Sequence, residues 1–74
     1  MPRKPRFTGK ELIAALGRQG FVVVRVRGSH HLLKTADGRA TVVPVNGKET
    51  IGPGLLAQIL RDCELDVEDL KSRD

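Results

Sequence analysis

Apolar residues recur at helical spacing near the start of the chain. They occupy positions that fall on one side of a 3.6-residue helix: Leu12, Ile13, Ala15 and Leu16. Just before them, Thr8 and Glu11 have the spacing of a capping box, in which each side chain binds the backbone amide of the other residue. Gly20 suits the end of such a helix, because glycine accepts the left-handed conformation common there. The pattern predicts a helix over residues 9–18 that buries Leu12, Ile13 and Leu16.

The middle of the chain alternates in the manner of β-strands. Residues 21–26 are rich in β-branched side chains, and simple alternation predicts two sets on opposite faces: Val22, Val24 and Val26 on one, and Val23, Arg25 and Arg27 on the other. Gly28-Ser29 permits a reversal into a second strand over about residues 30–35. Asp37-Gly38 is a typical hairpin sequence and leads to a third strand over residues 40–45. The three strands are predicted to form an antiparallel meander.

A second helix is predicted to follow the strands. Pro44 cannot donate a ladder hydrogen bond, so the end of the third strand should lie at a sheet edge. The second helix should begin at Gly52-Pro53, because proline is pre-organised for the first helical position, and end near Cys63. Its core stripe is Leu55, Leu56, Ile59 and Leu60. Asp66 is placed to cap a short last helix.

This order of elements defines an α+β fold. We expect α-β-β-β-α, with two helices packed on one face of a three-stranded antiparallel sheet, which is the layout of double-stranded-RNA-binding domains. A chain of 74 residues is short enough to form one domain with a thin core. We therefore expect a basic N-terminal arm over residues 1–7 and a single domain over residues 8–74.

Basic residues are concentrated toward the N-terminus. Residues 1–48 hold ten of the 13 Lys and Arg residues but only two of the nine acids, Glu11 and Asp37. Six of the acids lie in residues 61–74. Together with a formal net charge of +4, this asymmetry indicates an anionic partner, most simply nucleic acid. An ordinary charged surface is the alternative interpretation, and composition alone does not decide between them.

The only two histidines of the chain are adjacent, in Gly28-Ser29-His30-His31. The nearby charges are five bases (Arg25, Arg27, Lys34, Arg39 and Lys48) against Asp37 alone. A histidine can exchange a proton near neutral pH, because its ordinary pKa is about 6.5. RNA cleavage needs a base to take the 2′-hydroxyl proton and cations to stabilise the phosphorane, so this segment has suitable chemistry.

Consecutive residues of a strand point to opposite faces, so only one of the two histidines can face the open side of the sheet. Alternation places Lys34 on the same side as His30, which favours His30 as the catalytic base and leaves His31 as the alternate. The candidates for contacts to RNA are Arg25, Arg27, Ser29, Lys34, Arg39 and Lys48.

Several kinds of chemistry do not fit the sequence. We expect no cofactor and no metal, because adjacent strand histidines diverge and no cysteine or carboxylate cluster completes a site. The only aromatic residues, Phe7 and Phe21, stand at core positions and provide no platform for stacking bases. Cys63 is the single cysteine and is expected to be a small buried hydrophobe in a reducing, cytoplasmic setting. No apolar run approaches the roughly 20 residues of a membrane span.

A series of short motifs, taken in order, carries a family resemblance. The motifs are Leu12-Ile13, Gly20-Phe21-Val22, Gly28-Ser29-His30-His31, Thr41-Val42-Val43-Pro44-Val45 and Ile51-Gly52-Pro53-Gly54-Leu55-Leu56. No single motif is specific, but in this order they resemble the HicA (YcfA-like) family of mRNA interferase toxins. The resemblance covers roughly residues 9–69.

The resemblance implies an endoribonuclease toxin that cleaves mRNA, inhibits translation and is neutralised by a HicB-type antitoxin. It also implies that the histidine of the Gly-Ser-His motif, here His30, is catalytic. The start of the second helix departs from the family, which usually has Gly-Thr-Leu where this chain has Gly52-Pro53-Gly54-Leu55. Without the threonine hydroxyl, a phosphate contact at that helix would rest on backbone amides. A non-catalytic RNA-binding module and a partner-binding fragment of a larger assembly remain as alternatives.

Overall fold

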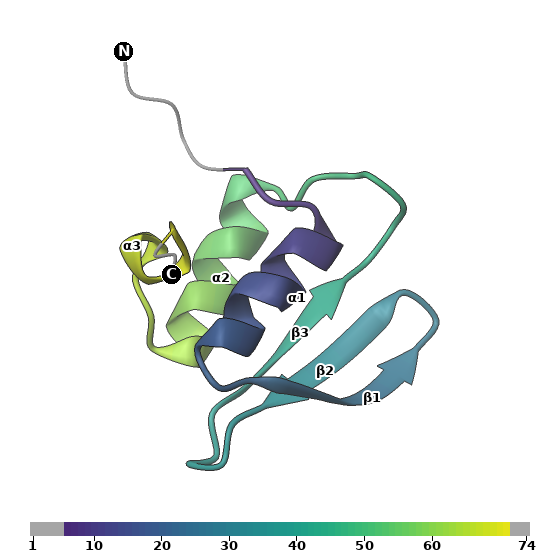
Figure 1. Cartoon of the computed structure of the whole chain (residues 1–74). Coiled ribbons are helices and arrows are strands. Elements are labelled where there is room, and N and C mark those ends of the chain that lie inside the picture. Colours follow the sequence, from purple (N-terminus) through teal and green to yellow (C-terminus); the bar gives the residue numbers. More distant parts are fainter. Residues whose placement is uncertain (1–5, 72–74) are drawn as a thin grey trace.

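The structure is a computed structural model that describes residues 6–71 of the 74-residue chain, so residues 1–5 of the predicted basic arm lie outside it. Its elements are α1 (Gly9–Arg18), β1 (Val22–Arg27), β2 (His30–Lys34), β3 (Ala40–Pro44), α2 (Pro53–Cys63) and α3 (Val67–Lys71). Figure 1 shows α1 and α2 on the same side of the three-stranded sheet. The predicted α+β fold and its α-β-β-β-α order are confirmed.

The start of α1 is held by the predicted capping box. The backbone N–H of Thr8 donates to Oε1 of Glu11 at 2.9 Å, and the N–H of Glu11 donates to Oγ1 of Thr8 at 3.1 Å. These two bonds satisfy amides that have no partner within the helix. At the other end, Gln19 is the C-cap and Gly20 has a φ of 96°, which ends the helix as predicted.

The sheet is an antiparallel meander in the order β1-β2-β3. Gly28 adopts a φ of 57° in the turn between β1 and β2, a conformation that glycine reaches without strain. β3 is an edge strand and Pro44 is its last residue, in agreement with the prediction. The register between β2 and β3 is regular and pairs His30 with Pro44 and Leu33 with Thr41.

The predicted alternation of β1 is wrong, because the strand contains a β-bulge. Val23 pairs with Leu33 and Arg25 pairs with Leu32, so Val24 is an extra residue without a partner on β2. The extra residue reverses the alternation at that point. Val22 therefore shares a face with Arg25 and Arg27, whereas the prediction placed it with Val26. Val23 shares a face with Val26, whereas the prediction placed it with the two arginines.

The core lies between the helices and the inner face of β2 and β3. Its fully buried side chains are Leu12, Leu16, Leu33, Val43, Ile59, Cys63 and Leu70. Burial of Leu12 and Leu16 confirms the predicted phase of α1, in which Ile13 is partly buried. On α2, Leu56 and Ile59 are buried and Leu60 is partly buried, as predicted.

Leu55 is a correction to the predicted core of α2, since its side chain is 40% exposed. It lies in a groove at the edge of the sheet, together with Val42 and Gln58. β3 is the last strand on that side, so no further strand covers Leu55.

The short last helix is present as α3, and its Leu70 side chain is buried. The carboxylate of Asp69 accepts a hydrogen bond from the backbone N–H of Asp66 at 2.8 Å. Two side chains from the end of α1 donate to carbonyls of α3: Arg18 to Leu70 at 3.4 Å, and Gln19 to Asp69 at 3.1 Å. The last helix is therefore tied to the first.

Gly9 is the point at which α1 touches the end of β3. It is buried, and a Cβ at this position would collide with the carbonyl oxygen of Pro44 and lie 2.9 Å from the Cα of Val45. Both obstacles are backbone atoms, which cannot move aside as a flexible side chain could. The absence of a side chain at Gly9 thus sets how closely α1 approaches the end of β3. Pro44 at that end pairs with His30, the first residue of β2.

We expect Gly9→Ala to destabilise the domain by about 1–3 kcal/mol, as overpacking of a close contact does. Gly17→Ala is the matched control, because a Cβ at Gly17 in the same helix meets no atom within 4 Å. Alanine there should stabilise the helix by about 0.5–1 kcal/mol. Urea unfolding of both variants measures the two effects. A rise in stability on Gly9→Ala would show that α1 does not contact the backbone of Pro44 and Val45 as closely as described.

Candidate nucleic-acid interface

The two histidines begin β2, the central strand, and they face opposite sides of the sheet. His31 is followed two residues later by Leu33, which is fully buried under the helices, and His31 pairs with the buried Val43. His31 is therefore on the helix side, where it is half-buried. By alternation His30 is on the other, open side, and it is exposed. Lys34 shares that side, as predicted.

Cations from β1 lie beside His30 on the open side. Arg27 pairs directly with His30, and Arg25 pairs with Leu32, so both arginines share the face of His30. Lys34 pairs with Val22 at the far end of the same face. β1 and β2 contain no acidic residue. The open side of the sheet therefore carries a histidine and three cations on adjoining strands.

The same face has an apolar centre that the sequence did not reveal. Leu32 pairs with Arg25 on one side and with Val42 on the other, and Val42 is 42% exposed. Pro44 and Ala40 pair with His30 and Lys34. We call this surface the open face; its members are Val22, Arg25, Arg27, His30, Leu32, Lys34, Ala40, Val42 and Pro44. Only the pairing across three strands brings these residues together, since no sequence motif contains them.

His31 is hydrogen-bonded to the turn that precedes it. Its Nδ1–H donates to the carbonyl oxygen of Ser29 at 3.2 Å, which requires the tautomer or charge state with hydrogen on Nδ1. The backbone N–H of Val45 donates to the same carbonyl at 2.7 Å. Ser29 is half-buried and immediately precedes His30. His31 therefore makes a contact that holds the turn, while His30 is free to meet a ligand.

Arg39, another predicted RNA contact, is engaged within the domain. Its Nε donates to the Asp37 carboxylate at 3.1 Å, and its Nη1 donates to the carbonyl oxygen of Cys63 at 2.6 Å. Its guanidinium also lies over the ring of Phe21, 5.4 Å from the centroid. These partners anchor it to the end of α2, on the helix side. The structure does not bring Arg39 to the open face.

Lys48 stands in the exposed loop between β3 and α2, where the N–H of Glu49 donates to the carbonyl of Asn46 at 3.0 Å. It is outside the paired strands that form the open face. Of the six predicted RNA contacts, three lie on the open face, Ser29 flanks it, and Arg39 and Lys48 lie elsewhere.

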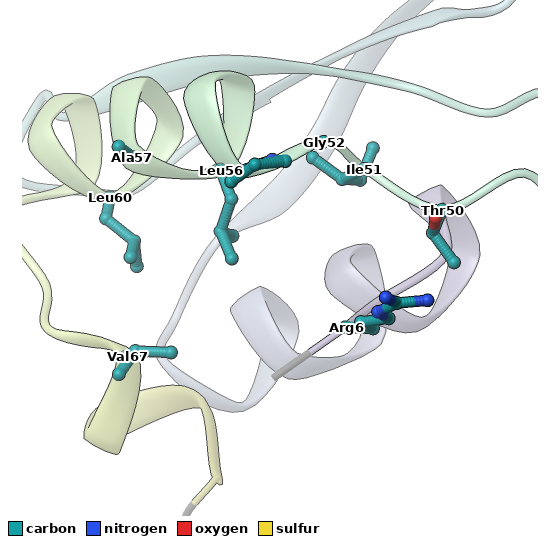
Figure 2. Close-up of a pocket in the computed structure, with 9 residues that line it drawn as sticks. Arg6, Thr50, Ile51, Gly52, Leu56, Ala57, Leu60 and Val67 are labelled. Carbon is teal, nitrogen blue, oxygen red and sulfur yellow. The ribbon is translucent and has the colours of Figure 1, made fainter. Parts of the chain in front are cut away.

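A cleft among the described residues lies on the other side of the molecule, away from the open face. It has a volume of about 510 Å³ and lies between the start of α2 and α3. Figure 2 shows Leu56, Ala57, Leu60 and Val67 around it, with Arg6 near the opposite wall. Its lining includes no histidine, cysteine or carboxylate, so this cleft has no group for acid–base chemistry. Gly52, the N-cap of α2 at its margin, makes no side-chain capping bond, because glycine has no side chain that could accept one.

The single cysteine of the chain, Cys63, also bears on reactivity. Cys63 is fully buried, and burial, followed by the negative charge of Asp62, raises the pKa of its thiol to about 11. The thiol is therefore protonated near neutral pH and acts as a core residue, as predicted. Within residues 6–71, no group of three or more His, Cys, Asp or Glu side chains is arranged to hold a metal ion. In the same part of the chain, no helix has both the length and the apolar character of a membrane span.

These features define a class: a small basic α+β domain that presents a histidine and arginines on the uncovered face of its sheet. Residues 9–65 match the family described as HicA toxin of bacterial toxin-antitoxin. The match covers most of the chain, and the protein belongs to the HicA toxin family. This confirms the resemblance found in the sequence and implies a toxin–antitoxin partner. Comparison with curated proteins gave no match.

The Asp37–Arg39 pair in the β2–β3 hairpin contributes a pH-dependent stability to the fold. Hydrogen bonds from the Thr35 hydroxyl and then from Arg39 lower the pKa of the Asp37 carboxyl from its ordinary 3.8 to about 2. A carboxyl whose pKa is lower in the folded protein stabilises the fold above its unfolded pKa, and the effect is lost as the pH falls through the folded pKa.

We therefore expect Asp37→Asn to be less stable than the wild type at neutral pH, with the difference shrinking between about pH 4 and pH 2. Urea midpoints of both proteins across this range measure the effect. A difference that stays constant down to pH 2 would mean that the ionised carboxylate does not contribute.

Proposed function

We propose that this protein is the toxin of a HicA/HicB-type system and acts as a metal-independent endoribonuclease that cleaves mRNA and thereby inhibits translation. Membership of the HicA toxin family supports this proposal. The single observation that carries it is the pairing of His30 with Arg27 on the open face, beside Arg25 and Lys34. His30 and the neighbouring cations are the types of group that cleavage by a 2′-hydroxyl needs: a proton acceptor and positive charges to stabilise the phosphorane.

In the proposed reaction, the 2′-oxygen of RNA attacks the adjacent phosphorus while its proton passes to His30. The bond from phosphorus to the 5′-oxygen breaks, the departing oxygen takes a proton from solvent water, and a 2′,3′-cyclic phosphate remains. Arg27 is the cation nearest in register to His30 and would stabilise the charge of the phosphorane, with Arg25 as its neighbour on the strand. Lys34 lies toward the other end of the face and would hold the RNA backbone.

A small RNA-binding module without catalysis is the second candidate. The apolar centre of the open face, formed by Leu32 and Val42 among cations, suits a binding surface as well as an active site. Both candidates require RNA on this face, and only the fate of the RNA distinguishes them.

The proposed partner is a HicB-type antitoxin that keeps RNA away from His30 by covering the open face in the cytoplasm. The mixture of exposed apolar and basic residues there favours a protein surface that is apolar at its centre and acidic at its rim.

We expect the protein to cut a synthetic RNA in the presence of EDTA and to leave the same sequence intact as DNA, because DNA lacks the 2′-nucleophile. His30→Ala should reduce cleavage by at least about 100-fold, since a positioned base contributes roughly that much. It should keep RNA binding and stability, because the exposed His30 side chain contributes little to packing. Product analysis for the cyclic phosphate and growth after expression measure these effects.

His31→Ala is the matched control for the histidine assignment. It removes a hydrogen bond to Ser29 but no group on the open face, so we expect a milder loss. Cleavage by His30→Ala together with loss of activity in His31→Ala would move the catalytic role to His31. If the wild type binds RNA but does not cleave it, the protein is an RNA-binding module without catalysis.

RNA affinity should fall as salt rises, because neutralised phosphates release counterions. Replacing Arg25, Arg27 or Lys34 by glutamine should each reduce the slope of log affinity against log salt by about 0.7, the value for a single-stranded phosphate contact. Lys10→Gln on α1 is the control, since Lys10 is exposed away from the open face. Equal effects of all four changes would indicate attraction by overall charge rather than by this face.

A further inference from the structure

β1 is exposed along its whole length, although four of its six residues are valines. All six residues of Val22–Arg27 are exposed. Four of them are valines, with exposed fractions of 60% for Val22, 40% for Val23, 51% for Val24 and 54% for Val26. In a domain of this size, four adjoining exposed valines are a large share of apolar surface to leave in water.

The exposure follows from where the helices sit. α1 and α2 pack on the sheet chiefly through β3, and Figure 1 shows β1 as the strand that lies away from them. Val23 and Val26 point to the helix side, yet no helix of residues 6–71 covers them. Val22 points to the open side, which no described element covers. β1 thus projects beyond the layer of helices with both faces uncovered.

The outer edge of β1 is also unpaired. Its only neighbour in the sheet is β2, so backbone donors and acceptors on the other edge have no strand partner in the described chain. The opposite edge of the sheet differs: Pro44 removes a donor from β3, and Thr41 of β3 donates to the Asp62 carboxylate of α2 at 3.0 Å. Proteins usually blunt an exposed edge, and β3 is the better protected of the two.

Charge restricts what can pair with β1. Arg25 and Arg27 are on this strand, and there is no acidic residue between Leu12 and Ala36. An antiparallel second copy of β1 would bring four arginines onto two adjoining strands, and like charges at close cross-strand positions are destabilising. An acidic strand would instead pair with these arginines while its apolar residues cover the valines.

We propose that β1 is the docking strand for an extended, acidic and partly apolar segment of a protein partner, which adds a fourth strand to the sheet. The backbone bonds of the added strand would supply affinity, and the alternating side chains would supply specificity. Identifying this partner with the antitoxin rests on the proposed function. A strand added to β1 would lie two strand spacings, about 10 Å, from β2. His30 is on β2 and pairs with Arg27 of β1. The rest of the partner can therefore extend from the added strand over the open face.

The test uses the whole chain and a short blocked peptide of alternating glutamate and valine. NMR of the backbone amides, with hydrogen exchange, should show slower exchange and shifted signals in Val22–Arg27 and no change in Ala40–Pro44. The same peptide N-methylated at every residue keeps its charge but has no amide donor, and it should not protect β1. A lysine–valine peptide should not bind, because its charges match those of Arg25 and Arg27.

A double reversal, Arg25→Glu with Arg27→Glu, should weaken binding of the glutamate–valine peptide by at least about fivefold. Lys10→Glu on α1 makes a charge reversal away from β1 and should leave binding unchanged. The methylated peptide tests the wild-type protein, so the inference remains falsifiable if the double variant does not fold.

Three outcomes would overturn the inference: no protection of β1, equal binding of the methylated peptide, or protection that rises with protein concentration alone, which would make a second copy the occupant. No RNA is present in this assay. Absence of RNA cleavage therefore leaves the result on β1 untouched, and failure of the peptide to bind leaves the cleavage prediction standing.

Discussion

Burial of Leu33 and Val43 beneath α1 and α2 is the constraint on which the geometry of the site depends. Side chains alternate along a strand, so once Leu33 points into the core, His31 must point to the same side and His30 to the other. The pairing of β2 with β1 then carries the same orientation across to Arg27 and Arg25. The presentation of a histidine among cations is thus a consequence of hydrophobic packing on the opposite face of one strand.

The small size of the domain explains why one side of the sheet stays bare. Two helices of 10 and 11 residues can cover only part of a three-stranded sheet on one face, and here they cover β3 and β2. The uncovered surface holds both the cations suited to RNA and the valines suited to a protein strand. The open face and the outer edge of β1 are adjacent, so a partner anchored at the edge and an RNA on the face would compete for the same region.

The basic residues of the central segment have different roles, which their charge does not distinguish. Arg25 and Arg27 project from a strand into solvent, whereas Arg39 binds Asp37, the Cys63 carbonyl and the Phe21 ring. Arginine suits the second role because its planar group can make several directed hydrogen bonds while stacking on an aromatic ring. Arg39 joins the β2–β3 hairpin to the end of α2 and so helps hold the helix layer on the sheet.

Local patterns were sufficient for the elements of this fold. The capping box of Thr8 and Glu11, the turn glycine Gly28 and the helix start at Pro53 act over a few residues, and their predictions were confirmed. The opposite orientation of His30 and His31 was likewise predictable, because it needs only the two-residue period of a strand. What the sequence alone did not determine was the bulge at Val24, the exposure of Leu55, the internal partners of Arg39 and the apolar centre of the open face. Each of these depends on contacts between segments that are distant in the sequence. The packing of helices against strands decides those contacts, and local sequence patterns do not contain that information.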